Sequence, residues 1–158
     1  MSPGLKPLWG LFAILVGATV VVSALRAFGP RDQVPWRTDF AAAKAEAVAA
    51  GKPLFAYFTA DWCPPCQQMR RTTWADPRVA AALAARFVPV KIDIDRDPQT
   101  AIAYGIDPLP TYIVADAGGE PRDAASGYAP ADAMLAWLDA AAKPTAPAAA
   151  ATQASVGE

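Results

Sequence analysis

Cys63 and Cys66 stand three positions apart, a few residues after the short apolar run LFAYFT at residues 54–59. The two residues between them are Pro64 and Pro65, and proline is tolerated in the first turn of a helix, where a backbone N–H has no intrahelical partner. The pattern therefore predicts a buried strand, a short loop and a helix that begins at the cysteine pair. The pair is thus placed at the junction of a strand and a helix.

A helix N-terminus favours a thiolate over a thiol, because it carries about half a positive charge and free N–H groups. Cys63, at the exposed start of this helix, is the predicted attacking nucleophile, and Cys66, one turn inside, is predicted to resolve the mixed disulfide. Two other interpretations are a structural disulfide and half of a zinc site. A disulfide across a single turn closes a very small loop and adds little stability, and two Cys without a single His are too few ligands for zinc.

The composition excludes several functions. The chain contains no histidine, which removes His-based catalytic triads, imidazole general bases and His-ligated metal sites. We expect no metal and, because flavin and nicotinamide motifs are missing, no cofactor. The chain has 14 Lys+Arg against 15 Asp+Glu and a pI near 5.4, so a broad positive surface for nucleic acid is not expected.

Hydrophobic patterning predicts helices and strands in the order α-β-α-β-α-β-β-α. The first helix has Thr38 as its expected N-cap and ends at Gly51, a typical residue just after a helix. The elements expected after the cysteines are a helix at 78–87, a strand at 87–95, a short helix at 99–106, a hairpin of strands at 111–116 and 121–128, and a helix at 129–142.

Residues 7–25 contain no charge and are flanked by Lys6 and Arg26. As a helix they reach about 28 Å, close to the ~30 Å hydrocarbon core of a bilayer. We therefore expect residues 1–27 to form an anchor in the inner membrane. The alternative is a signal segment cleaved near residues 22–24, which would release a secreted protein. Either places the remainder in the periplasm or otherwise outside the cytoplasm.

The other boundaries follow from local composition. Residues 28–35, FGPRDQVP, contain two prolines and a glycine and are expected to be a linker. Residues 144–158 are rich in Ala and Pro, offer no apolar run to bury, and are expected to be a disordered tail. The predicted folded domain comprises residues 36–143.

The segment ADWCPPC at residues 60–66, the strand before it and GIDPLPT at residues 105–111 resemble the thioredoxin superfamily. The stretches KPLFAYFTADWC at 52–63 and TWADPRV at 73–79 are most similar to the C-terminal thioredoxin-like domain of DsbD-type thiol:disulfide interchange proteins. The similarity covers about residues 36–143. It implies an α/β thioredoxin fold, a central mixed β-sheet flanked by helices, preceded here by the N-terminal transmembrane or signal helix.

The resemblance also assigns residues to a substrate groove. It implies that Pro110 is a cis-proline, which turns the backbone of Leu109 toward the cysteines, where it pairs with a substrate strand. Trp62 would form an apolar lip of this groove, and core packing is the alternative role. The implied partners are protein disulfides and a thiol electron donor in the membrane or periplasm, such as a transmembrane reductase of the DsbD kind.

The chain departs from the family at Tyr57, six residues before Cys63, where many members have a buried Asp beneath the second cysteine. A buried carboxylate normally accepts the proton of the resolving thiol. A phenol, with a reference pKa of about 10, does so poorly at neutral pH. The turn after Cys66 contains no acid, so we expect resolution through water or the substrate and slow release of the mixed disulfide.

The second departure is the Pro-Pro dipeptide. Pro64 and Pro65 lack an N–H, so the first main-chain donor available to the Cys63 sulfur is that of Cys66. Fewer donors stabilise the thiolate less, which lowers the reduction potential of the cysteine pair and favours a reductase. The absence of a His between the cysteines also favours a reductase. The expected function is an extracytoplasmic protein-disulfide reductase. The alternatives are a periplasmic thiol oxidase or isomerase, and a redox-inert thioredoxin-like binding module.

Overall fold

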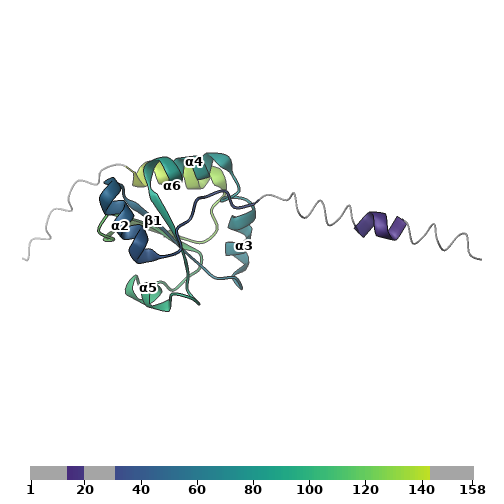
Figure 1. Cartoon of the computed structure of the whole chain (residues 1–158), viewed down its shortest axis with the longest axis horizontal. Coiled ribbons are helices and arrows are strands. Elements are labelled where there is room, and N and C mark those ends of the chain that lie inside the picture. The colour runs from purple at the N-terminus through teal and green to yellow at the C-terminus, as the bar shows by residue number, and fades with distance from the viewer. Residues whose placement is uncertain (1–13, 20–30, 143–158) are drawn as a thin grey trace, which may run out of the picture. The chain divides into compact units, whose positions relative to one another are not determined.

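The computed structural model describes residues 14–19 and 31–142 (Figure 1). The chain divides into two units, Met1–Arg31 and Asp32–Glu158. In the first unit residues 14–19 are helical. Across the described ranges, no helix has the length and apolar character needed to cross a bilayer. Most of the predicted anchor and all of the predicted tail lie outside the described residues.

The second unit follows the predicted order of elements, with the helical region after the cysteines divided into two helices. In the labels of Figure 1, its elements are α2 (Phe40–Ala50), β1 (Leu54–Thr59), α3 (Pro64–Arg71), α4 (Pro77–Arg86), β2 (Val88–Asp93), α5 (Pro98–Ala103), β3 (Thr111–Ala115), β4 (Pro121–Ser126) and α6 (Ala131–Ala141).

The four strands form one mixed sheet in the order β2-β1-β3-β4, which confirms the predicted mixed sheet. The β1 strand is parallel to β2 and antiparallel to β3, and β3 and β4 form the predicted hairpin. Thr59, at the end of β1, pairs with Asp93, and Phe58 pairs with Thr111 at the start of β3. The loops after β1, after β2 and before β3 therefore meet at one edge of the sheet, where the cysteines lie.

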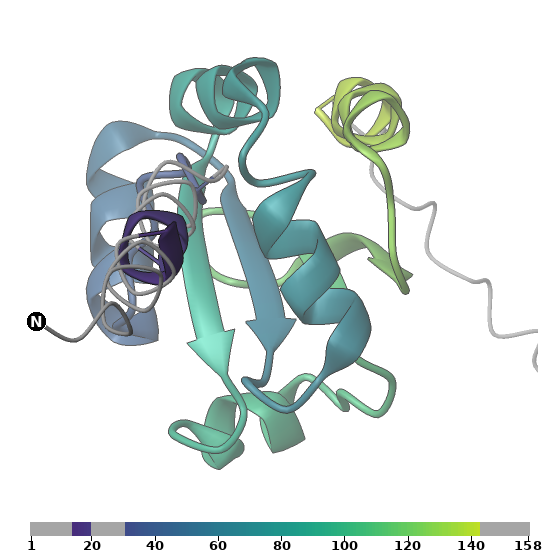
Figure 2. The ribbon, with the colours of Figure 1, turned by 90° about the vertical axis from the view of Figure 1, so that its right-hand side faces the viewer.

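Helices cover both faces of this sheet because alternate residues of a strand point to opposite faces. Phe55 and Tyr57 of β1 pack with buried residues of α3, α4 and α6. Leu54, Ala56 and Phe58 pack with buried residues of α2 and α5 on the other face. Figure 2 shows α2 on one side of the sheet and α3 and α6 on the other.

Aromatic rings dominate the core on the α3 face. The ring of Tyr57 lies 4.9 Å from that of Trp74 and 5.5 Å from that of Trp36, measured between centroids. Trp36 and Trp74 meet edge to face at 5.3 Å. Such pairs contribute roughly 0.5–1.5 kcal/mol beyond the area they bury. Trp36 precedes α2, so the segment before the first core helix helps to build this face.

Residues 32–38 are tied to the sheet and to the loop after α3. The Gln33 N–H donates to the Trp74 carbonyl oxygen at 2.8 Å, and Arg37 forms a parallel bridge with Val90. Val34 is buried in the core. The folded unit therefore includes residues 32–35, which belong to the predicted linker, because their backbone groups and one apolar side chain find partners about 40 residues away in sequence.

The ends of α2 agree with the prediction in part. Gly51 adopts a left-handed conformation, with φ of 61°, and its N–H closes the helix. The N-cap, however, is Asp39 rather than Thr38, since the Asp39 carboxylate accepts a hydrogen bond from the Ala42 N–H at 2.9 Å.

Candidate active site

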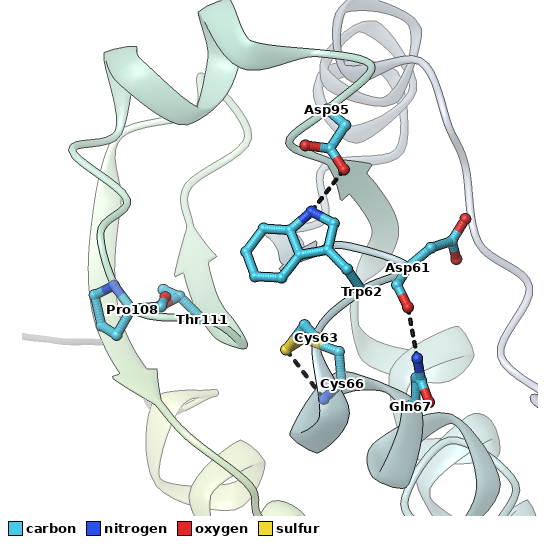
Figure 3. The surroundings of a disulfide bond; sticks show 8 residues. All are labelled: Asp61, Trp62, Cys63, Cys66, Gln67, Asp95, Pro108 and Thr111. Atoms are coloured by element: carbon cyan, nitrogen blue, oxygen red, sulfur yellow. Dashed lines mark hydrogen bonds between the residues drawn. A yellow bond between two sulfur atoms is a disulfide. The ribbon is translucent and has the colours of Figure 1, made fainter.

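Cys63 is the N-cap residue of α3, and a disulfide joins it to Cys66 (Figure 3). Pro64 and Pro65 occupy the first turn of the helix, as predicted. The Cys66 N–H donates to the Cys63 Sγ at 3.3 Å. The helix terminus thus directs one main-chain donor at the sulfur of the first cysteine.

Both sulfur-bearing residues are buried in the disulfide form. Cys63 is 3% exposed and Cys66 is 2% exposed. They form an apolar cluster with Ala60, against which Ile94 and Leu109 pack. The predicted exposure of Cys63 is therefore wrong for this form, because loops from two other strands pack against the helix start.

The loop before β3 carries the expected cis peptide bond, between Leu109 and Pro110. Pro110 is buried, and its carbonyl oxygen accepts a hydrogen bond from the Gly127 N–H at 2.8 Å. The Thr111 hydroxyl donates to the Pro108 carbonyl oxygen at 2.7 Å. Within the described part of the chain, the main-chain N–H and C=O of Leu109 make no hydrogen bond. Leu109 therefore packs beside the disulfide with its main-chain groups unpaired.

Trp62 lies on the surface beside the cysteines. Its side chain is 63% exposed, which excludes the alternative role of core packing. The indole N–H donates to the Asp95 Oδ2 at 2.9 Å and so ties the ring to the loop after β2 (Figure 3). The exposed ring supplies an apolar surface next to Cys63.

The loop before Cys63 is held by α3. The Gln67 side-chain amide donates to the Asp61 carbonyl oxygen at 2.6 Å (Figure 3). The Asp61 carboxylate lies 3.6 Å from the Arg70 guanidinium, and both side chains are at least half exposed. An exposed ion pair of this kind contributes little to stability, so the amide hydrogen bond restrains this loop more than the ion pair does.

A cavity of about 190 Å³ adjoins the second cysteine. Cys66 lines this cavity and Cys63 does not. The other lining side chains include Asp32, Tyr57, Arg70, Trp74 and Lys91. The two cysteines therefore have different surroundings, one beside Leu109 and the exposed Trp62, the other next to a partly polar cavity.

Tyr57 forms part of the cavity wall. It is 2% exposed, and no hydrogen bond of ordinary geometry reaches its hydroxyl among the described residues. The buried Trp74 Nε1 is unpaired in the same sense. Burial raises the pKa of Tyr57 above its ordinary value, and the negative charge of Asp32 acts in the same direction. Tyr57 is therefore a neutral phenol at physiological pH.

Asp32 is a largely buried acidic residue at this site that the sequence did not indicate. Its side chain is 15% exposed and its carboxylate accepts hydrogen bonds from the Val34 N–H and the Trp36 indole N–H, at 3.1 and 2.8 Å. Burial raises the pKa of Asp32 despite these donors and the nearby Lys91. No motif or spacing marks this residue, since it lies 31 positions before Cys63 in the predicted linker.

The fold and the site together define a class of protein. A mixed sheet of this order, a Cys-x-x-Cys pair at a helix N-terminus after β1 and a cis-proline loop beside it are the features of a thiol–disulfide oxidoreductase with a thioredoxin fold. The family described as "Thioredoxin-like domain" matches residues 40–142, and the chain belongs to this family.

Individual relatives agree with this assignment. Over 93 residues the chain is 32% identical to a thioredoxin of Alicyclobacillus acidocaldarius, a match that covers 59% of this chain and 85% of the relative. It is 31% identical over 140 residues to the thiol:disulfide interchange protein DsbD of Salmonella paratyphi A, which covers 79% of this chain and 25% of that protein.

A solved structure gives the same result. The oxidised C-terminal domain of DsbD from Neisseria meningitidis superimposes with a TM-score of 0.55 at 27% identity and covers 66% of this chain and 97% of that domain. The chain is thus a thiol–disulfide oxidoreductase, near the DsbD type within the thioredoxin superfamily.

Proposed function

We propose that the chain is an extracytoplasmic protein-disulfide reductase. The observation that carries the reductive direction is the set of donors around the Cys63 sulfur. Within the described residues, the only hydrogen bond to this sulfur comes from the Cys66 N–H, because Pro64 and Pro65 have no N–H to offer. A thiolate with few donors is less stabilised, which favours the disulfide of the enzyme over its dithiol and makes the dithiol a better reductant.

The reductive cycle uses both sulfurs. The Cys63 thiolate attacks a substrate disulfide, forms a mixed disulfide and releases the first substrate sulfur as a thiolate, which takes up a proton. Cys66 then loses its proton and attacks the Cys63 Sγ, which forms the Cys63–Cys66 disulfide and releases the second substrate sulfur. Two electrons and two protons pass to the substrate.

The substrate segment binds across the loop before β3. Leu109 has unpaired main-chain groups beside the disulfide, and an extended peptide can pair with them as an added strand. The exposed ring of Trp62 then covers apolar side chains of the bound segment. Pro110 turns the chain so that Leu109 lies next to the cysteines.

An outside source must return the enzyme to its dithiol form. We propose a thiol electron donor in the membrane or periplasm, as the relation to DsbD suggests. The uncharged residues 7–25 support anchoring in the inner membrane with the thioredoxin-like domain in the periplasm. Release after signal cleavage is the alternative.

The direction is tested by equilibrating the full-length protein with glutathione buffers and trapping free thiols by alkylation. A reductase keeps its cysteines as a disulfide under mildly oxidising conditions, and its pair is mainly dithiol in living cells. A pair that stays dithiol in mildly oxidising buffer would instead indicate the oxidase or isomerase alternative, and a pair that is mainly disulfide in cells would indicate the oxidase.

Turnover is tested by insulin reduction and by trapping. Cys66→Ala is expected to accumulate mixed disulfides through Cys63, because the resolving thiol is missing. The double variant Cys63→Ala, Cys66→Ala is the matched control and should capture nothing. Absence of both insulin reduction and captured substrates would favour the redox-inert binding module.

A further inference from the structure

Tyr57 and Trp74 line the cavity beside Cys66, and the Tyr57 hydroxyl and the Trp74 Nε1 are both buried. Buried polar groups of proteins are almost always hydrogen-bonded, either to protein or to ordered water. Among the described residues, no hydrogen bond of ordinary geometry reaches either atom, although the side chains of Thr59 and Trp74 lie close enough to the Tyr57 hydroxyl to lower its pKa. A cavity of about 190 Å³ with several polar groups in its wall is large enough to hold water. Water inside it can contact the polar side chains that line it.

The same cavity brings together one sulfur and one buried carboxylate. Cys66 lines it from the first turn of α3, and Asp32 lines it from the segment before α2. The Asp32 carboxylate is positioned by the Val34 N–H and the Trp36 indole, so it is held in one orientation. Water in the cavity can therefore contact the sulfur of one residue and the carboxylate of the other.

Other charges also face this cavity. Besides Asp32 and Cys66, its ionisable lining residues are Tyr57 on β1, Asp61 and Arg70 at α3, Lys91 and Asp93 on β2, and Arg96 and Asp97 after β2. Asp61 pairs with Arg70 and Asp93 pairs with Arg96, at 3.6 and 3.5 Å. Lys91 lies 3.8 Å from Asp32. Burial, opposed by Lys91 and Arg70, raises the pKa of Asp32, which brings this carboxylate closer to the pKa that a proton acceptor needs near neutral pH.

We propose that Asp32 accepts the proton of the Cys66 thiol through water held in this cavity. The inference rests on the oxidoreductase activity and holds for either direction of exchange. When Cys66 attacks the mixed disulfide, its S–H bond breaks, the proton passes through water to the Asp32 carboxylate, and the electron pair of the new Cys66 thiolate forms the bond to the Cys63 Sγ. The substrate sulfur leaves with the electrons of the broken S–S bond. Asp32 later returns its proton to solvent.

The test uses the reduced full-length protein and 5,5′-dithiobis(2-nitrobenzoate) in a stopped-flow absorbance experiment. The first nitrothiobenzoate is released when Cys63 attacks, and the second when Cys66 resolves the mixed disulfide. The variant is Asp32→Asn, because an amide oxygen still accepts from Val34 and Trp36 but does not take up a proton. At pH 7 the rate of the second phase should fall about a hundredfold, the lower end of the range for general base catalysis, while the rate of the first phase changes less than about twofold.

The pH profile separates proton transfer from a structural role. In the unsubstituted protein the rate of the second phase should fall as the pH decreases through the pKa of Asp32, since only the carboxylate accepts a proton. The pH profile of this rate therefore has an inflection at that pKa. In Asp32→Asn this inflection should disappear, and the rate should rise about tenfold per pH unit until the thiol itself ionises. Asp123→Asn, an exposed carboxylate on β4, removes the same charge outside the cavity and should leave both phases unchanged.

Three results in Asp32→Asn would overturn the proposal. The rate of the second phase could be unchanged, it could increase because Asp32 acts only as a repelling charge, or the rates of both phases could fall equally.

Tyr57→Phe provides a second variant that keeps Asp32. This variant should leave the pH inflection of the second phase in place, because the Asp32 carboxylate is unchanged. A reagent reaction with no second phase in the unsubstituted protein would contradict the oxidoreductase activity itself, and the glutathione equilibrium tests the reductive direction separately.

Discussion

An N-cap side chain accepts hydrogen bonds from the N–H groups two and three residues further on. In α3 these positions are Pro65 and Cys66, and only Cys66 has an N–H to donate to the Cys63 Sγ. We expect Pro65→Ala to add a second donor and stabilise the Cys63 thiolate. A hydrogen bond to a charged group contributes about 1.5–3 kcal/mol, so the glutathione equilibrium should shift at least about tenfold toward the dithiol.

Pro64→Ala is the matched control for this change. It removes a proline from the same turn, but the N–H that it restores is at the first helical position, which does not point at the N-cap side chain. Its glutathione equilibrium should stay within about threefold of the unsubstituted protein. Equal shifts in the two variants would show that loss of proline rigidity, and not the added donor, sets the redox equilibrium.

The raised pKa of Asp32 has a consequence for stability. A carboxyl whose pKa is higher in the folded than in the unfolded chain binds more protons when folded, so it contributes stability at low pH and loses it as the pH rises through the folded pKa. We expect the difference in unfolding free energy between Asp32→Asn and the unsubstituted protein to shift in favour of the variant from pH 4 to pH 7. Urea denaturation at both pH values measures this difference, and a shift in the opposite direction would contradict the raised pKa.

At the scale of elements, the regular segments were predicted correctly where one local pattern defined them. Val88, Val90 and Ile92 alternate with other residues, as expected of the strand predicted at 87–95, and an Asp-Pro pair stands at the start of each helix predicted at 78–87 and 99–106. The Cys-Pro-Pro-Cys spacing likewise located the start of α3. In each case residues close in sequence determine the structure, so no distant contact was needed.

The parts that were not predicted depend on distant contacts. Gln33 bonds to Trp74 and Asp32 lies beside residues of β1 and α3, but nothing in the local composition of residues 28–35 distinguishes them from a linker. The burial of Cys63 has the same origin, since Leu109 packs against it from a loop 46 positions away. Pairings of this kind leave no periodic trace in the sequence.

The segment before α2 should therefore contribute measurable stability. Val34→Ala removes two buried methyl groups, and at about 0.8 kcal/mol per carbon it should lower the unfolding free energy by roughly 1–2 kcal/mol. Val48→Ala is the matched control, because Val48 is 63% exposed on α2 and should change stability by less than about 0.5 kcal/mol. Urea denaturation of both variants measures the difference. A Val34 variant as stable as the control would show that the segment does not belong to the cooperative unit.

At the scale of the whole molecule, we expect membrane attachment to depend on the proposed anchor and catalytic activity to depend on the folded unit alone. Deletion of residues 7–25 should release the protein from membranes that otherwise retain it through alkaline extraction, because the uncharged segment is the main apolar stretch outside the folded unit. Insulin reduction per molecule should stay within about twofold. Recovery in the soluble extract of a chain that lacks its first 22–24 residues would favour the cleaved signal segment.

The positions of the two sulfurs allow substrate exchange and proton exchange to proceed at the same time. Cys63 lies beside Leu109 and Trp62, whereas Cys66 lines the cavity formed with the segment before α2. A substrate protein bound at Cys63 covers the surface where its own disulfide is exchanged. The proton of Cys66 is taken up in the cavity, so a large substrate protein need not dissociate from Cys63 for the second half of the reaction to occur.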